Sequence, residues 1–271
     1  MTFSASWLAL REPADHAARS AALTRAIADA LAGDPAPAIL DLAAGTGSNL
    51  RYLSLAMPRG RWLLVDRDPA LLARVPADDR LDTREMNLAT LSDPSIFEGR
   101  ALVTASALLD LVSEEWMRAL AARCAESGAA VLFALTYDGR IACSPEDPDD
   151  GSIVELVNQH QQTDKGFGPA LGPGASDAAA RCFEAAGYGV QRASSDWRLP
   201  PEARELQRQL IEGWAEAASE ITPARARLID SWRDRRLAHL AAGWSEIFVG
   251  HEDMIATLRS SHPQILRPLD R

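Results

Sequence analysis

The stretch that decides the fold is residues 38–49, AILDLAAGTGSN. A short apolar run ends in an acid, continues through small residues and two glycines, and gives way to a helical pattern near Leu50. This order predicts a buried parallel strand, a tight turn and the start of a helix. Glycine permits a positive φ and leaves no Cβ between the main chain and a ligand. Open α/β sheets bind nucleotides at such a turn, at the carboxyl end of a strand.

Three classes of nucleotide-binding turn fit this outline, and residue spacing separates them. A P-loop needs a Gly-Lys-Ser/Thr ending, which the stretch lacks. A dinucleotide fingerprint needs a third small residue three positions after Gly47, where Leu50 stands. The stretch resembles instead the first motif of class I S-adenosylmethionine (SAM) methyltransferases, Asp/Glu-x-Gly-x-Gly-x-Gly, with Ala43 in place of the first glycine. The next predicted strand, 61–66, ends in Asp66, whose carboxylate can accept hydrogen bonds from both ribose hydroxyls.

Strands and helices alternate from residue 38 to residue 135, as a doubly wound sheet requires. With the resemblance, this predicts an α/β fold whose seven-stranded, mostly parallel sheet lies in one domain over 1–271. The fifth strand is expected at 129–135, and the chain after it is expected to leave the sheet on the cofactor side. The last strand is expected at 244–249, with a terminal helix after it.

Three segments depart from the minimal fold. A cap helix that begins at Asp15 is expected within about 1–37, before the first strand. Helical lid insertions are expected at about 140–176 and 200–242, near the cofactor edge of the sheet. In the family such a leading helix often closes over the cofactor, so Arg11 and Arg19 could reach the methionine carboxylate. Surface charges on a packing helix are the alternative.

Composition excludes several classes of function. The formal net charge is −10, from 28 basic and 38 acidic residues, which disfavours a nucleic-acid backbone as partner. The three cysteines are far apart and form no Cys-x-x-Cys pair, which suits reduced thiols in a cytoplasm and no structural zinc. No stretch approaches the ~20 apolar residues of a membrane span. We expect a cytoplasmic protein without a metal ion. A homodimer is possible.

The resemblance also implies which residues contact SAM. Asn87 has a donor and an acceptor for the adenine, and a role as a turn residue competes with this. Ser106 ends the central strand, beside the methionine part of the cofactor. The full set of cofactor candidates is Asp41, Ala43, Gly45, Gly47, Asn49, Asp66, Arg67, Asn87, Leu88 and Ser106.

Residues 158–168 are the densest polar stretch in the chain. His160 and Asp164 stand four apart, so they share a face if the helix extends that far, and they are the catalytic candidates. A near-neutral pKa suits a histidine to take the acceptor's proton. Lys165 is the only lysine beside 27 arginines, and with Phe167 it is a candidate for substrate binding. A solvated polar helix end is the alternative for the whole stretch.

Tyr137 and Asp138 complete the substrate candidates, because they follow the expected end of the fifth strand. The sequence thus predicts a SAM-dependent methyltransferase that acts on an oxygen or nitrogen atom of a small polar molecule. An NAD(P)-dependent oxidoreductase stays open as an alternative, although Leu50 argues against it. So does a non-catalytic SAM-binding subunit or sensor.

Overall fold

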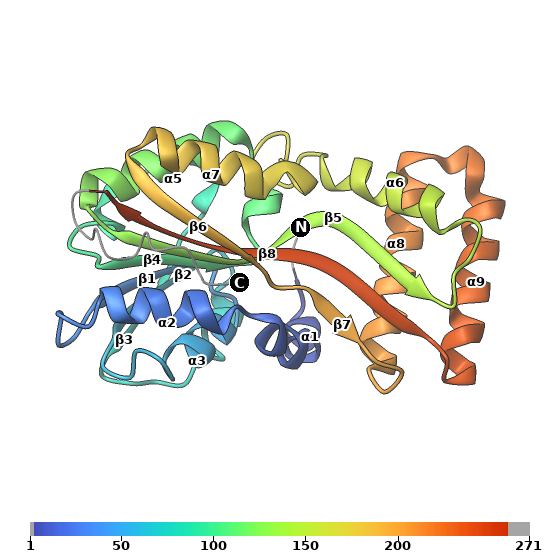
Figure 1. Cartoon of the computed structure of the whole chain (residues 1–271), viewed down its shortest axis with the longest axis horizontal. Helices are drawn as coiled ribbons and strands as arrows, with labels where there is room; N and C mark the ends of the chain where they lie inside the picture. The colour runs from blue at the N-terminus through green and yellow to red at the C-terminus, as the bar shows by residue number, and fades with distance from the viewer. Residues whose placement is uncertain (1–2, 260–271) are drawn as a thin grey trace.

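The computed structural model describes residues 3–259 and shows an α/β fold around one eight-stranded sheet (Figure 1). The strand order is β3-β2-β1-β4-β5-β8-β6, and β7 pairs with β8 off this path. Strands β1 to β5 pair in parallel, whereas β8 runs antiparallel to β5, β6 and β7. The strands are β1 (Ala38–Leu42), β2 (Arg61–Asp66), β3 (Leu81–Glu85), β4 (Leu102–Ser106), β5 (Ala130–Ser144), β6 (Tyr188–Ser194), β7 (Trp197–Leu199) and β8 (Glu246–Leu258).

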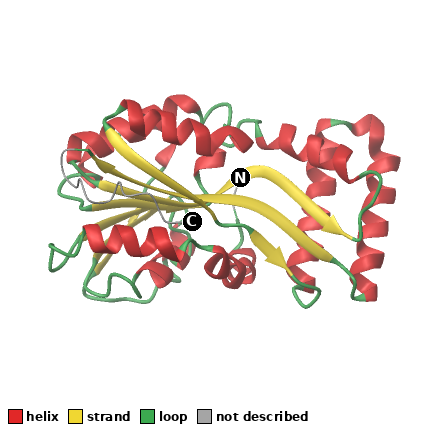
Figure 2. Cartoon of the chain, viewed as in Figure 1, coloured by secondary structure: helices red, strands yellow, loops and turns green. Residues whose placement is uncertain are grey.

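Helices cover both faces of the sheet, with α5 and α7 on one face and α2 and α3 on the other (Figures 1 and 2). The strand order reverses between β1 and β4, so the loops after these strands diverge and leave a crevice at the carboxyl ends. The helices are α1 (Ala5–Ala18), α2 (Ala21–Ala30), α3 (Ser48–Leu53), α4 (Pro69–Leu72), α5 (Glu114–Ser127), α6 (Asp150–Gln161), α7 (Ala175–Ala185), α8 (Arg204–Ile221) and α9 (Ala226–Ala242).

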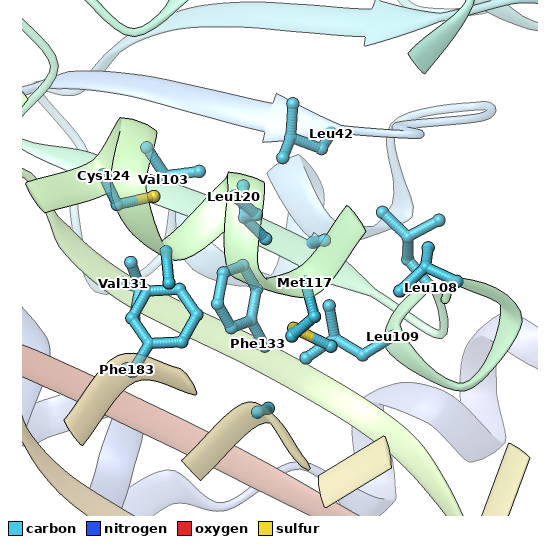
Figure 3. Packing of buried hydrophobic residues seen from close by; sticks show 14 of the residues in the cluster. Leu42, Val103, Leu108, Leu109, Met117, Leu120, Cys124, Val131, Phe133 and Phe183 are labelled. Atoms are coloured by element: carbon cyan, nitrogen blue, oxygen red, sulfur yellow. The ribbon is translucent and has the colours of Figure 1, made fainter. Parts of the chain in front are cut away.

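The main core lies between the sheet and the helices α5 and α7. Strands β1 and β4 are almost wholly buried, which explains their continuous apolar sequences. Figure 3 shows Val131 and Phe133 of β5 packed with Leu120 of α5 and Phe183 of α7. The rings of Phe133 and Phe183 are 5.5 Å apart between centroids. This packing fixes the strand ends that carry the functional residues.

The expected end of the fifth strand at residue 135 is wrong, because β5 continues to Ser144. Strand β8 runs beside its whole length, down to the pair Ser144 and Glu246, with register shifts after Phe133 and Tyr137. The outer halves of β5 and β8, with β7, α6, α8 and α9, enclose a second core around Trp197, Trp214 and Trp232. The segments expected as lids therefore build, for the most part, a second packed layer at the far end of β5 and β8 (Figure 1).

Both ends of the described chain also differ from expectation. Asp15 does not begin a helix, because α1 starts at the cap Ser4 and runs through Pro13, and a second helix, α2, follows from the cap Ser20. Residues 250–258 do not begin the expected terminal helix but continue β8, where β6 pairs with residues 252–258. The part of that expected helix beyond residue 259 lies outside the described residues. The buried carboxylate of Asp253 secures this part, accepting hydrogen bonds from the backbone N–H groups of Ser20 (2.8 Å) and Leu135 (2.9 Å).

None of the helices between residues 3 and 259 is long and apolar enough to cross a membrane.

Candidate functional site

A cavity opens at the carboxyl ends of β1, β2 and β4, beneath α1. Counted with its opening to solvent, it has a volume of about 1170 Å³. All cofactor candidates except Gly47 line it, and so do Lys165 and Phe167. The other four candidates, Tyr137, Asp138, His160 and Asp164, are not among its lining residues.

The two glycines of the turn have different roles. Both have positive φ, +55° at Gly45 and +80° at Gly47. A Cβ on Gly45 would lie 3.0 Å from Leu8 Cδ1 of α1, so the turn and the covering helix touch at this point. A Cβ on Gly47 would face Val75 and Arg51 instead, outside the cavity lining. Gly47 therefore differs from the other cofactor candidates in lying outside the cavity lining, and it serves as the left-handed N-cap of α3.

Alanines stand at two further left-handed positions beside the cavity. Ala43 follows β1 with φ +53°, and Ala107 follows β4 with the same φ. A left-handed conformation costs an L-residue roughly 1–2 kcal/mol. The family motif has glycine in the place of Ala43, which this backbone geometry explains. No sequence motif marked Ala107 as a left-handed position.

Asp41 is the buried acid of the cavity, with no exposed surface. Its Oδ1 accepts a hydrogen bond from Asn49 Nδ2 at 2.9 Å, and its Oδ2 has no hydrogen-bond partner within residues 3–259. Asn49 is held in turn by Arg19, whose Nη1 donates to its Oδ1 at 2.9 Å. Burial raises the pKa of Asp41 to about 7, although the Asn49 hydrogen bond and the Arg19 charge oppose this. A cationic group of a ligand would satisfy the unpartnered oxygen and keep the carboxylate ionised.

Asp66 ends β2 on the neighbouring side of the turn. Its Oδ2 accepts a hydrogen bond from the backbone N–H of Gly45 at 2.8 Å, and its Oδ1 accepts one from the backbone N–H of Asp68 at 2.9 Å. The carboxylate is thereby fixed in orientation. Each oxygen has a second lone pair, so the pair of oxygens suits a vicinal diol such as a ribose.

Asn87 lies at the end of the cavity beyond β3. Its Oδ1 accepts from the backbone N–H of Ala89 at 3.0 Å, so the role as a turn residue is confirmed. The amide nitrogen, Nδ2, would suit a ring nitrogen of a base as its acceptor. Leu88 beside it is buried, and its carbonyl accepts from Trp116 Nε1 at 2.6 Å.

Helix α1 forms the roof of the cavity. Arg11 lines it and donates to both oxygens of Asp15, at 2.9 and 3.0 Å. Arg19 does not line it, because its side chain is bound to Asn49 and stacks 4.5 Å above the ring of Tyr52. Of the two arginines considered for the methionine carboxylate, the structure places only Arg11 at the cavity.

Only part of the polar stretch 158–168 lines the cavity. Lys165 and Phe167 face the cavity, whereas Asp164 shapes their loop by accepting from the N–H groups of Gly166 (2.7 Å) and Gly168 (3.1 Å). Helix α6 ends at Gln161, so His160 and Asp164 do not share a helix face. His160 lies behind Lys165, with its Nδ1 3.3 Å from Lys165 Nζ. Neither catalytic candidate therefore lines the cavity itself.

Tyr137 and Asp138 lie on the extended part of β5, away from the cavity lining. The hydroxyl of Tyr137 donates to Asn158 Oδ1 at 2.7 Å, and burial raises its pKa well above the ordinary value. Asp138 accepts from Arg140 Nε at 2.9 Å. They were substrate candidates because the fifth strand was expected to end at residue 135. In the structure both lie on the part of β5 that extends beyond that residue.

Several lining residues were missed by sequence reasoning. Ala44, Thr46 and Ser48 stand inside the quoted turn, so the motif itself could have indicated them. The others reach the cavity only through tertiary packing: Phe3, Leu8, Asp15, Asp68, Leu71, Met86, Ala107, Leu108 and Leu111.

The strand order and the place of the cavity now assign the fold. From β1, the strands β2 and β3 follow toward one edge of the sheet, and β4 and β5 follow toward the other, all of them parallel. The antiparallel strand β8 is inserted between β5 and the edge strand β6. The glycine turn after β1 and the acid at the end of β2 meet at one cavity. This is the class I methyltransferase fold.

Comparison with known proteins finds similarity at a low level. No family model and no curated protein matches the sequence. The cyclopropane synthase MmaA2 from Mycobacterium tuberculosis has 14% identity and a TM-score of 0.47, over 94% of this chain and 95% of that one.

Two other solved structures are longer than the region they share with this chain. An O-methyltransferase family protein from Burkholderia thailandensis has 15% identity and a TM-score of 0.43, over 84% of this chain and 55% of that one. The phosphoethanolamine N-methyltransferase 2 of Haemonchus contortus, solved with phosphomonomethylethanolamine and S-adenosylhomocysteine, has 14% identity and a TM-score of 0.41, over 82% of this chain and 49% of that one.

Proposed function

We propose that the protein is a SAM-dependent methyltransferase that acts on an oxygen or nitrogen atom of a small, partly polar molecule. The observation that carries the proposal is the pair of carboxylates in one cavity, Asp41 with an unpartnered oxygen and Asp66 with both oxygens fixed. SAM combines a cationic amino-acid end with a ribose diol, which are the two groups that these carboxylates suit.

The hydrogen bonds within the turn also favour SAM over a dinucleotide. A dinucleotide's diphosphate binds to free backbone N–H groups at the turn and helix start. Here the N–H of Gly45 donates to Asp66, and the N–H of Gly47 donates to the carbonyl of Ala44 at 2.9 Å. With these donors used and two carboxylates nearby, the site disfavours a diphosphate.

The residues divide the work along the cavity. Asp66 would hold the ribose, Asn87 and Leu88 the adenine, and Asp41 the ammonium end, with Arg11 available for the carboxylate. Bound SAM supplies a methyl group already activated on a sulfonium sulfur. The chain's own contribution is to align an acceptor with that methyl group and to exclude water, and proximity of this kind accounts for much of the rate in such displacements.

Calorimetric titration with SAM, S-adenosylhomocysteine and NAD tests the proposal. We expect binding of the first two and none of NAD. Binding of NAD alone would favour an oxidoreductase. Incubation with methyl-tritiated SAM and fractions of a small-metabolite extract then separates an enzyme from a non-catalytic SAM-binding subunit, which would bind SAM and transfer no label.

A further inference from the structure

The single lysine of the chain lies in the wall of the cavity. Lys165 exposes 8% of its surface, although lysine is a residue type that is rarely buried without a partner. Its loop is fastened to the segment after β4, because the N–H of Leu171 donates to the carbonyl of Val112 at 2.8 Å. Phe167 of the same loop packs edge-on against Trp116, with the ring centroids 5.7 Å apart. The loop that carries Lys165 is therefore held against the segment after β4, and Lys165 lines the same cavity as Ser106 and Leu108.

A chain of polar contacts leads from this amine to the surface. Lys165 Nζ donates to Thr163 Oγ1 at 2.9 Å and lies 3.3 Å from His160 Nδ1. His160 Nε2 lies 2.9 Å from Glu220 Oε2, on helix α8. The side chain of Glu220 is 62% exposed, whereas that of His160 is 16% exposed. The contacts thus join the cavity, the end of α6 and solvent.

The geometry fixes which atoms donate. Thr163 uses its hydroxyl proton on the carbonyl of His160, at 2.8 Å, so its oxygen accepts from Lys165. A neutral histidine beside the Glu220 carboxylate carries its proton on Nε2, which leaves Nδ1 as an acceptor. Two N–H bonds of Lys165 are then directed at Thr163 and His160. In the neutral amine these are both of its hydrogens, and the lone pair is left for another partner.

We propose that Lys165 takes the proton of the methyl acceptor, and that His160 and Glu220 are positioning residues that orient the amine and carry the proton outward. This inference rests on the proposed function and names the base of that same site. It replaces His160 as the proton acceptor, because His160 does not line the cavity.

The acceptor's oxygen or nitrogen forms a bond to the methyl carbon, and the pair of the breaking carbon–sulfur bond goes to sulfur. The acceptor keeps the electrons of its bond to hydrogen, and that proton goes to Lys165 Nζ. The ammonium then passes a proton to His160 Nδ1 as Nε2 releases one toward Glu220 and solvent.

Charges around the amine support this role. Burial lowers the pKa of Lys165, and Glu220 partly opposes the shift, so the neutral amine is favoured more than in an exposed lysine. Of the other ionisable groups nearby, His160 contacts the amine directly and Asp164 is turned to its own loop. Arg11 lines the same cavity and is paired with Asp15.

Because the chain has one lysine, its titration can be measured directly. Brief acetylation with acetic anhydride at a series of pH values, read by peptide mass spectrometry, reports Lys165 separately from the terminal amine. We expect a midpoint below the ordinary lysine value of about 10.4, and protection by S-adenosylhomocysteine. The Glu220→Gln variant should lower the midpoint further, while Glu216→Gln, an exposed acid one turn earlier on α8, should not. A midpoint at the ordinary value would overturn the proposal.

Turnover supplies the second test, with methyl-tritiated SAM and the extract fraction that yields a labelled product. Lys165→Met and Lys165→Arg should keep SAM affinity within about threefold and lose roughly 10²–10⁴-fold in rate. Glu220→Gln should move the rising limb of the pH–rate profile to lower pH, and Glu216→Gln should leave it unchanged. Methylation by Lys165→Arg at the wild-type rate would overturn the inference but not the proposed function. If the wild-type protein does not bind SAM, the proposed function itself is overturned.

Discussion

The carboxylate of Asp66 accepts a hydrogen bond from the backbone N–H of Gly45, 2.8 Å away. The acid at the end of β2 is thus fastened to the turn after β1, and each fixes the other's place in the cavity. A change at Asp66 should therefore affect both the proposed ribose contact and the shape of the turn.

Replacement of Asp66 by alanine should weaken SAM binding by about 10–100-fold or more, since two charge-assisted hydrogen bonds of roughly 1.5–3 kcal/mol each would be lost. Titration calorimetry measures this. Asp93→Ala is the matched control, because Asp93 accepts from the backbone N–H of Ser95 at 2.9 Å in a similar turn and does not line the cavity. An Asp66→Ala protein that folds and keeps the wild-type Kd would rule out the ribose assignment.

The two glycines of the turn should respond differently to a side chain. Gly45→Val should abolish SAM binding, because its Cβ already lies 3.0 Å from Leu8 Cδ1 and the branches would have to enter the cavity or displace α1. Gly47→Ala should keep SAM binding and lose about 1–2 kcal/mol of stability, the cost of a left-handed alanine. Parallel calorimetry and thermal unfolding distinguish the two. Equal loss of binding in both variants would contradict the placement of Gly47 outside the cavity.

The affinity for S-adenosylhomocysteine should rise with pH through the titration of Asp41. Its pKa is raised to about 7 in the free protein, and a ligand ammonium favours the ionised form. Binding should therefore release protons and become tighter between about pH 5.5 and 7.5, a range that keeps most of an ordinary amino group charged. Asp41→Asn should remove this dependence, measured as binding enthalpy in buffers of different ionisation heat. A pH-independent affinity in the wild type would separate Asp41 from the ligand's charge.

Stability should fall as pH rises through the titration of Asp110. This acid is 7% exposed, its Oδ1 has no partner among the described residues, and burial raises its pKa to about 6. The folded state then binds more protons than the unfolded state between about pH 4 and pH 6, so stability is lost as pH rises through that range.

Asp110→Asn should therefore gain stability relative to the wild type from pH 4 to pH 8, by an amount on the order of 2–3 kcal/mol. Urea unfolding at the two pH values measures it, with Asp79→Asn, an exposed acid, as control. A gain that is the same at both pH values would mean that Asp110 keeps an ordinary pKa in the folded protein.

The sequence by itself determined the elements that depend on local order. Residues 38–49 and 61–66 formed the expected strands and turn because a continuous apolar run followed by small residues has few alternative structures. The acid at each strand end then lay at the cavity, since parallel strands end at one edge of a sheet. Local sequence order therefore sufficed to predict which strand ends meet at the cavity.

Tertiary structure alone decided the side of the cavity that we propose for the acceptor. Strand β5 could continue past Leu135 only because β8 supplies hydrogen-bond partners along its whole length, and that pairing is remote in sequence. It carries Tyr137 away from the cavity and lets α8 bring Glu220 against His160. Periodicity reports which residues are buried but not which distant element buries them. For that reason the sequence identified Lys165 as unusual, and only the fold shows what holds it.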